Sequence, residues 1–350
     1  MSSGGSSRLH GVSTLLDAAR ELPSEVVTTT AQIDVAELDR YRTELTAYCY
    51  RMLGSGAEAE DAVQETMLRA WKRAETFEGR SSPKSWLYGI ATNVCIDMHR
   101  SPQRRARPMD LGPSSPPVES FLAPPLPETT WISPIGDDRI LPRNADPSEV
   151  AELRESVRLA FVAALQHLPA KQRAVLILCE VLRWQASEVA ELLDTTVAGV
   201  NSALQRARAG LAALPSRDAT TLSDADDPEL LERYVSAFER YDITELVTLL
   251  HDDAIQSMPP FAMWIEGAEN IGRWMVEPGP SACRGSRLVQ IRANGCPGFA
   301  QYRPSPDGGH HAWALVVLEV IDGRVREITA FLDVAELFPA FGLPLELPAA

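Results

Sequence analysis

The sequence has few cysteines and no long apolar run. Its 350 residues include five cysteines: Cys49, Cys95, Cys179, Cys283 and Cys296. An odd number without a CxxC pair or metal-site spacing argues against a disulfide framework and a metal site. No apolar stretch approaches the roughly 18 residues of a membrane span, and the N-terminus lacks a signal-peptide pattern. We therefore expect a reduced, cytoplasmic protein with no membrane partner.

The chain also lacks the positive charge of a protein that coats nucleic acid. It carries 33 basic and 48 acidic side chains, a net charge of −15. Residues 38–107 carry 12 basic and 9 acidic side chains, and residues 149–214 carry 7 of each. Residues 218–350 carry 9 basic and 21 acidic side chains, so the acidity is concentrated there. Binding of DNA through bulk charge is excluded, whereas binding through a local basic patch is not.

Apolar spacing predicts two all-helical domains, at residues 37–107 and 149–214. Residues 1–36 are rich in Ser and Thr with weak periodicity, so we expect a disordered arm. Gly54 ends the first predicted helix, and Ser82 caps the third. The buried stripe of the second helix is predicted to comprise Ala59, Val63, Met67, Ala70 and Trp71.

The two helical domains are joined by a proline-rich linker at residues 108–148. Ten of the forty residues from 108 to 147 are proline. So many fixed φ angles and missing N–H donors exclude a packed domain and predict a semi-extended segment. Trp131 within it is expected to pack against a neighbouring element.

The sequence pattern changes after the second helical domain, and residues 228–339 are predicted to form an α+β domain, followed by a tail at 340–350. Two helical segments precede a run of strand-like segments, and Asp307-Gly308 and Asp322-Gly323 mark hairpin turns. The helices are predicted at 229–240 and 243–251, and the strands at 287–293, 298–303, 312–321 and 324–331. The fold class is therefore multidomain: two all-α domains, then an α+β domain.

Residues 186–194 and 197–213 have the pattern of a helix-turn-helix around Thr195-Thr196. Apolar residues of both helices can pack together, which leaves small, amide and basic side chains exposed for bases and phosphates. These outward residues are Ala198, Asn201, Ser202, Gln205, Arg206 and Arg208. An ordinary helical hairpin with a solvated polar face is the alternative.

Three segments give this chain a family resemblance. LPAKQRAVLILCEV (168–181) precedes the helix-turn-helix, and AEDAVQETMLRAW (59–71) and WLYGIATNVCIDMHR (86–100) lie in the first domain. Together they resemble the extracytoplasmic-function (ECF) sigma factors of bacterial RNA polymerase, in the sigma-70 class. The resemblance implies that residues 37–107 are sigma region 2, which binds core polymerase and the −10 element. Residues 149–214 would be sigma region 4, which binds the −35 element.

The resemblance also implies roles for individual residues. One stripe would dock on the clamp helices of the large polymerase subunit: Asp61, Gln64, Glu65 and Leu68. A merely solvated face is the alternative for this stripe. The −10 contacts would be Arg80, Lys84, Trp86, Tyr88, Asn93, Arg100, Arg104 and Arg105, although Trp86 is equally a candidate core residue. The outward residues of the helix-turn-helix would contact the −35 element, where Asn201 and Ala203 replace the Lys or Arg common in the family.

Residues 228–339 resemble the SnoaL-like, ketosteroid-isomerase-like fold, a curved sheet and helices that form a cone. The predicted cone pocket comprises Phe261, Met263, Trp264, Trp274, Trp313 and Phe331, with a small molecule as its ligand. Candidates for a general base are Asp252, Asp253, Asp307, His251, His310 and His311, but no pair is positioned for acid–base work. We therefore expect no catalytic residues, no enzyme activity and no cofactor.

The expected function is that of a sigma factor for RNA polymerase and promoter DNA, regulated in cis by its acidic C-terminal domain. One alternative is a polymerase-independent helix-turn-helix regulator with a ligand-sensing cone, which would not need the 59–71 stripe. The other is a cyclase or isomerase fused to DNA-binding helices. That reading predicts a buried carboxylate with a shifted pKa inside the cone.

Overall fold

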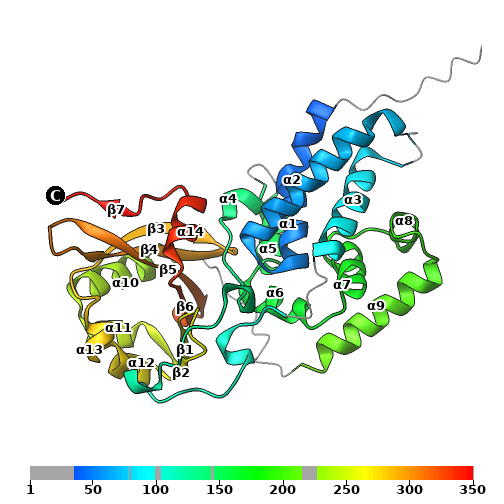
Figure 1. The fold of residues 1–350 in the computed structure, drawn as a ribbon. Coiled ribbons are helices and arrows are strands. Elements are labelled where there is room, and N and C mark those ends of the chain that lie inside the picture. Colours follow the sequence, from blue (N-terminus) through cyan, green and yellow to red (C-terminus); the bar gives the residue numbers. More distant parts are fainter. Residues whose placement is uncertain are drawn as a thin grey trace, which may run out of the picture.

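The computed structural model describes residues 35–77, 79, 81–98, 104–142, 146–214 and 227–349. The helices of the N-terminal two thirds of the described chain occupy one side of the molecule, and a curved sheet with its own helices occupies the other (Figure 1). Most of the predicted N-terminal arm, together with Arg80 and Arg100, lies outside the described residues. No helix among the described residues is long and apolar enough to cross a membrane.

The first helical domain contains helices α1 (Arg42–Leu53), α2 (Gly56–Arg73) and α3 (Pro83–Met98), after a 3₁₀ segment at Val35–Tyr41. Gly54 ends α1 in the left-handed conformation at φ 73°, and the Ser55 hydroxyl accepts a hydrogen bond from the Glu58 N–H. One predicted core residue is wrong: Trp71 is 64% exposed. It follows Ala70 by one residue and is therefore turned about 100° away from the buried stripe.

The second helical domain contains five α-helices and ends in the predicted helix-turn-helix. Thr196 caps the last helix by accepting a hydrogen bond from the Gly199 N–H at 3.0 Å. The helices are α5 (Pro147–Glu155), α6 (Leu159–Gln166), α7 (Ala170–Leu176), α8 (Ala186–Leu192) and α9 (Val197–Ala212).

The C-terminal domain is a mixed sheet with four helices on one face and the last helix on the other. The strand order is β2-β1-β6-β5-β4-β3, with β1 parallel to β6 and the other pairs antiparallel. The strands are β1 (Leu250–Ser257), β2 (Trp264–Glu266), β3 (Arg287–Ala293), β4 (Cys296–Pro304), β5 (His310–Ile321), β6 (Arg324–Phe331) and β7 (Glu346–Leu347). The helices are α10 (Pro228–Arg240), α11 (Ile243–Thr248), α12 (Ala268–Met275), α13 (Pro278–Ser281) and α14 (Val334–Ala340).

The predicted helix at 243–251 was too long. Helix α11 ends at Thr248, and β1 starts at Leu250 because this segment pairs with β6, about 75 residues further along the chain. Such nonlocal pairing is not visible in local periodicity. Both predicted hairpin turns connect neighbouring strands, at 305–309 and at Asp322-Gly323.

Alternate residues of the central strands enter two different apolar cores. In β5, Val316 and Leu318 pack beneath the helices α10–α12, whereas Leu315 and Val317 join a core shared with the two helical domains. A strand places successive side chains on opposite faces, so one sheet serves both cores. The C-terminal domain is therefore packed against the sigma-like helices through the back of its sheet.

The linker is extended, with single 3₁₀ turns and the short helix α4 (Asp137–Ile140). It follows the edge of the C-terminal domain, where the Trp264 indole donates to the Gly112 carbonyl at 2.8 Å. The Ser115 N–H donates to the Trp264 carbonyl, also at 2.8 Å. Trp131 is 3% exposed, so it is packed as expected.

Candidate functional site

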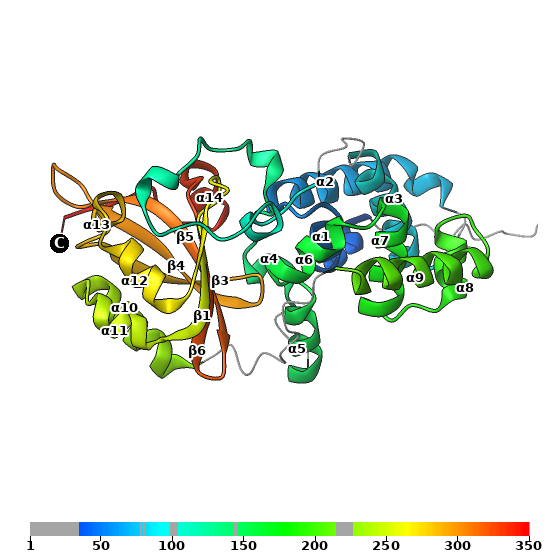
Figure 2. The ribbon, with the colours of Figure 1, turned by 90° about the horizontal axis from the view of Figure 1, so that it is seen from below.

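The turn between β3 and β4 is buried where all parts of the molecule meet. Asn294, with φ 56°, is fully buried. Its carboxamide oxygen accepts from the Ile135 N–H at 3.1 Å. Its nitrogen donates to the Tyr50 hydroxyl at 2.6 Å and to the Val157 carbonyl at 2.8 Å. One side chain thus joins the linker, α1 and the start of the second helical domain. The β3–β4 hairpin is directed toward α4 and α5 (Figure 2).

Gly295 completes this turn in a position that only glycine fits. Its φ is 72°, and a Cβ there would lie 2.9 Å from the Cβ and carbonyl oxygen of Arg154. Its N–H donates to Asp137 Oδ1 at 2.7 Å, and Asp137 Oδ2 accepts from Arg292 Nε at 3.2 Å. Burial raises the pKa of Asp137 despite these hydrogen bonds. We call Asn294 and Gly295 the hairpin tip.

The hairpin tip was absent from the sequence-based candidates. Asn-Gly is nevertheless the strongest two-residue signal for a hairpin turn, and it stands directly after the predicted strand 287–293. The turn itself was therefore predictable. Its burial between domains was not, because that depends on contacts with residues more than 130 positions away.

A second contact between the domains is electrostatic. Glu319 of β5 and Glu327 of β6 are opposite each other across the strands. Arg107, at the end of the first helical domain, lies 3.7 Å from Glu327, and Arg158, which is 5% exposed, faces Glu319. Burial, followed by repulsion from Glu327, raises the pKa of Glu319 to about 7, and the arginines oppose this shift.

Two buried arginines hold the helical domains together. Arg51 of α1 donates from Nη2 to the Ser156 hydroxyl at 2.6 Å. Arg173 of α7 donates to the Met52 carbonyl. Burial lowers the pKa of both guanidinium groups to about 10.

Helix α8 of the helix-turn-helix domain packs against α3 of the first domain. The rings of Tyr88 and Trp184 lie 5.1 Å apart, and Gly89 lies beside Leu192. Together with the arginine contacts, this packing places the two predicted DNA-reading domains side by side.

Two of the predicted −10 residues need correction, because the structure places them inside the protein. Tyr88 is fully buried beneath Trp184. Arg105 is 7% exposed and donates to Glu58 at 2.7 Å and to the Trp131 carbonyl at 2.8 Å. In this conformation neither side chain can reach DNA, and Tyr88 would become accessible only if the two helical domains separate.

The other described members of that set lie at or near the surface. Asn93 and Arg104 are exposed, and Arg104 lies 3.0 Å from His167 Nδ1. Lys84 forms an ion pair with Glu44. Trp86 is half-buried and packs against Phe77, in keeping with the structural role considered for it.

The predicted polymerase-binding and −35 sets are accessible. On α2, Leu68 is 46% exposed, and the stripe of Asp61, Gln64, Glu65 and Leu68 lies on the face opposite the core. On α9 all six predicted residues are exposed: Ala198, Asn201, Ser202, Gln205, Arg206 and Arg208. Arg206 donates to the Ser202 hydroxyl at 2.6 Å, and Arg208 pairs with Glu180 of the preceding segment.

The C-terminal domain contains a cavity of about 270 Å³, and three of the six residues predicted to line it do so. Phe261, Trp274 and Trp313 line it. Met263 is packed in the core beneath the helices, and Trp264 points toward the linker. Phe331 lies on the opposite face of the sheet, because its neighbour Ala330 occupies the cavity side.

None of the six candidate general bases lines the cavity. His251 and Asp253 lie 2.5 Å apart on β1, outside it. His310 contacts the Gly285 carbonyl, and His311 contacts the Ser305 hydroxyl. In the C-terminal domain burial raises the pKa of Glu319, and this carboxylate faces the helical domains rather than the cavity.

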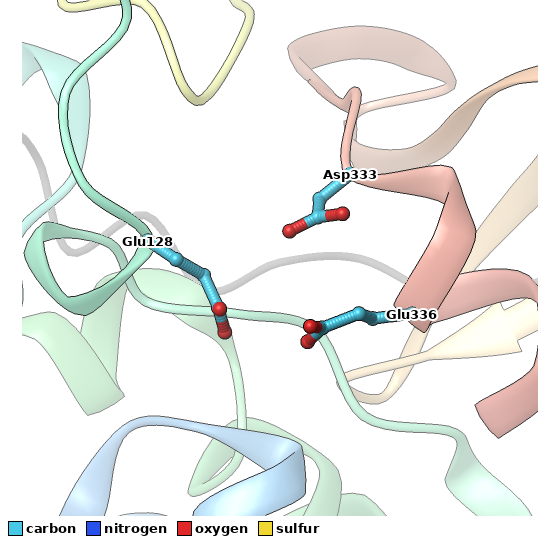
Figure 3. Close-up of side chains that lie close together, drawn as sticks. All are labelled: Glu128, Asp333 and Glu336. Carbon is cyan, nitrogen blue, oxygen red and sulfur yellow. The ribbon is translucent and has the colours of Figure 1, made fainter.

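Three exposed carboxylates meet where the linker approaches α14. Glu128 of the linker points toward Asp333 and Glu336 (Figure 3), with oxygens within 4.8 Å of one another. Partial burial and repulsion from Glu336 and Asp333 raise the pKa of Glu128. Exposed acidic clusters are common without an ion, so this one does not establish a metal site.

Replacing Glu319 with Gln should flatten the pH dependence of stability. The pKa of Glu319 in the folded protein, about 7, is above its ordinary value of 4.5, so the folded state holds this proton more tightly. Stability should therefore fall as pH rises from about 4.5 to 7 and then level off. Thermal melts of Glu319→Gln and wild type should differ most above pH 7, in favour of the variant. Parallel pH profiles, or the same change in the exposed control Glu229→Gln, would contradict this.

Comparison with known proteins agrees with the architecture. Residues 38–105 match the Sigma-70 region 2 family, residues 158–211 match Sigma-70, region 4, and residues 231–328 match the SnoaL-like domain. The chain is 46% identical over 314 residues to the ECF RNA polymerase sigma factor SigG of Mycobacterium tuberculosis (strain ATCC 25618 / H37Rv). This alignment covers 88% of the chain and 83% of SigG.

A second relative shares the whole domain order. The ECF RNA polymerase sigma factor SigJ of the same strain is 26% identical over 333 residues, covering 90% of this chain and 95% of SigJ. The crystal structure of M. tuberculosis SigJ has the same fold, with a TM-score of 0.56 and 22% identity, over 89% of this chain and 100% of that one. The predicted fold class is confirmed, and the chain belongs to the family of ECF RNA polymerase sigma factors, with a C-terminal SnoaL-like domain.

Proposed function

We propose that this sigma factor binds core RNA polymerase and directs it to specific promoters, and that its SnoaL-like domain restrains it in cis. The observation that carries the regulatory part is the buried hairpin tip, which joins region 2, the linker and region 4. Core polymerase, through the clamp helices of its large subunit, and promoter DNA are the proposed partners. The cytoplasm is the proposed location.

Accessible surfaces support the first part of this proposal. The α2 stripe around Leu68 is open to a partner helix, and the polar face of α9 is open to a DNA groove. A polymerase-independent regulator would leave the region 2 family match at residues 38–105 without a purpose. We therefore favour the function of a sigma factor over that of a polymerase-independent regulator.

Geometry supports the idea that the packed arrangement is restrained. The centres of the −35 and −10 elements are about 25 base pairs apart, which is roughly 85 Å of B-DNA at 3.4 Å per base pair. Here α8 of region 4 contacts α3 of region 2, and α9 is a helix of 16 residues, only about 24 Å long. One molecule in this arrangement cannot span both elements, so the domains must separate before both are bound.

The same packing covers part of region 2. Trp184 of region 4 lies over Tyr88 of α3, the helix proposed to read the −10 element. Separation of the domains would expose this face of α3. Closure and promoter binding therefore compete, and contacts that favour closure oppose transcription.

The hairpin tip is suited to set this equilibrium. The Asn294 carboxamide makes three hydrogen bonds to buried groups of other segments. Loss of such a side chain leaves its partners unsatisfied, which costs about 1–3 kcal/mol. A change of that size shifts a two-state equilibrium by roughly 5- to 150-fold.

Variants of the hairpin tip should release the restraint. Asn294→Ala removes the three hydrogen bonds, and Gly295→Ala places a Cβ against Arg154. With core polymerase in excess and limiting sigma factor, both variants should give more run-off transcript than wild type. The measurement is promoter-dependent transcription on a promoter selected from a library.

Gly323→Ala is the matched control for Gly295→Ala. Gly323 is also the second residue of a two-residue turn, with φ 71°, but the nearest atom to an added Cβ is 3.9 Å away. Both variants carry the same backbone strain, and only Gly295→Ala clashes across the domain interface. Equal transcription by the two variants, or less by the hairpin-tip variants than by wild type, would contradict the proposed restraint.

Substitutions on the two proposed binding surfaces should separate polymerase binding from promoter binding. Leu68→Asp should weaken co-purification with core polymerase, because it places a charge in the docking stripe. Arg206→Ala should leave core binding intact and weaken promoter binding by the holoenzyme, with a salt slope smaller by about one. The exposed Val276→Asp, on the SnoaL-like domain, is the control for Leu68→Asp. Core binding that is unaffected by Leu68→Asp would refute the docking assignment.

A further inference from the structure

The cavity of the SnoaL-like domain is mostly apolar. It lies between the sheet and the helices α10–α13, and its walls include Phe238, Met258, Phe261, Trp274, Trp313 and Ile328. Its volume of about 270 Å³ equals that of about nine water molecules at about 30 Å³ each. A ligand of roughly ten non-hydrogen atoms would fill it at interior packing density.

One wall of the cavity carries a cation that contacts no carboxylate of the described residues. The Arg303 guanidinium lies over the Trp313 ring, 3.3 Å from its centre, and donates from Nη2 to Cys283 Sγ at 3.0 Å. Its Nε is buried without a hydrogen-bond partner. Among the described residues no carboxylate lies within 4.0 Å of it, although Arg303 lines the cavity. A buried N–H donor on a cation is suited to an oxyanion.

A second polar side chain in the cavity also lacks a partner. Gln256 of β1 is 8% exposed and lines the cavity. Within the described part of the chain its carboxamide makes no hydrogen bond. Gln256 on β1 lies three strands from Arg303 on β4, so it offers a second polar group at another point of the cavity wall.

The linker between the two sigma regions closes part of this cavity. Leu122 lines it and packs against the core beneath the helices. The neighbouring Glu119 lies so close to α13 that a Cβ at Gly279 would be 2.8 Å from its Oε1. Glu119 is exposed and also lines the cavity, but it forms no ion pair with Arg303. A molecule in the cavity would therefore touch the segment that connects region 2 to region 4.

We propose that this cavity binds a small apolar carboxylic acid, with its carboxylate on Arg303 and its apolar part against Leu122 of the linker. The inference rests on the proposed role of the SnoaL-like domain as a regulator in cis. The proposal names the chemical class of the ligand. It also names the linker as the segment through which ligand binding would affect the sigma regions. The acid would bind noncovalently.

The test is direct binding to the full-length chain, in the absence of polymerase and DNA. Octanoate and 3-phenylpropionate, with ten and eleven non-hydrogen atoms, are the probes, and octanamide and octylamine are the uncharged and cationic controls. Calorimetric titration should give binding of both acids and at least tenfold weaker binding of the two controls, because a charge-assisted hydrogen bond is lost. Equal binding of acid, amide and amine, or no binding of either acid, would overturn the proposal.

Substitutions of Arg303 and Leu122 test where in the protein the acid binds. Arg303→Met should weaken octanoate binding about tenfold or more, whereas Arg303→Lys should retain part of it. Arg287→Met, at an exposed arginine of β3 that does not line the cavity, should bind as wild type does. Leu122→Ala should weaken binding without altering the preference for the acid. Unchanged affinity in Arg303→Met would overturn the ligand assignment, and transcription by the hairpin-tip variants would still test the proposed function separately.

Discussion

The arrangement of this sigma factor depends on one buried carboxamide. Asn294 is on the SnoaL-like domain, yet its hydrogen-bond partners belong to region 2, the linker and region 4. A buried amide of this kind is stable only if all its partners are in place. Moving any one of the three segments therefore leaves part of the buried Asn294 carboxamide without a partner.

These contacts explain how the SnoaL-like domain, which has no proposed DNA contact, can affect the two DNA-binding domains. The back of its sheet contributes Leu315 and Val317 to the core of the sigma regions, and its front encloses a separate cavity. The linker contacts both the rim of that cavity and the hairpin tip, through Leu122 and Ile135. Occupancy of the cavity and packing of the sigma regions are thus connected through a single extended segment.

The sequence predicted much of this structure, because many of its signals are local. The helix end at Gly54, the turn Asp322-Gly323 and the exposed face of α9 each depend on a few neighbouring residues. The errors have nonlocal causes. Tyr88 was assigned to DNA but is covered by another domain. Phe331 was assigned to the cavity, whereas strand alternation in a sheet buried on both faces places it behind.

The most direct test is the distance between region 2 and region 4 in the wild-type chain, measured with spin labels at Lys72 and Ala209. Both positions are exposed, one near the end of α2 and the other near the end of α9. The free protein should give a single narrow distance distribution, and the complex with core polymerase and promoter DNA a distribution shifted by tens of ångströms. The same distribution in both states, or a broad one in the free protein, would contradict the proposed restraint.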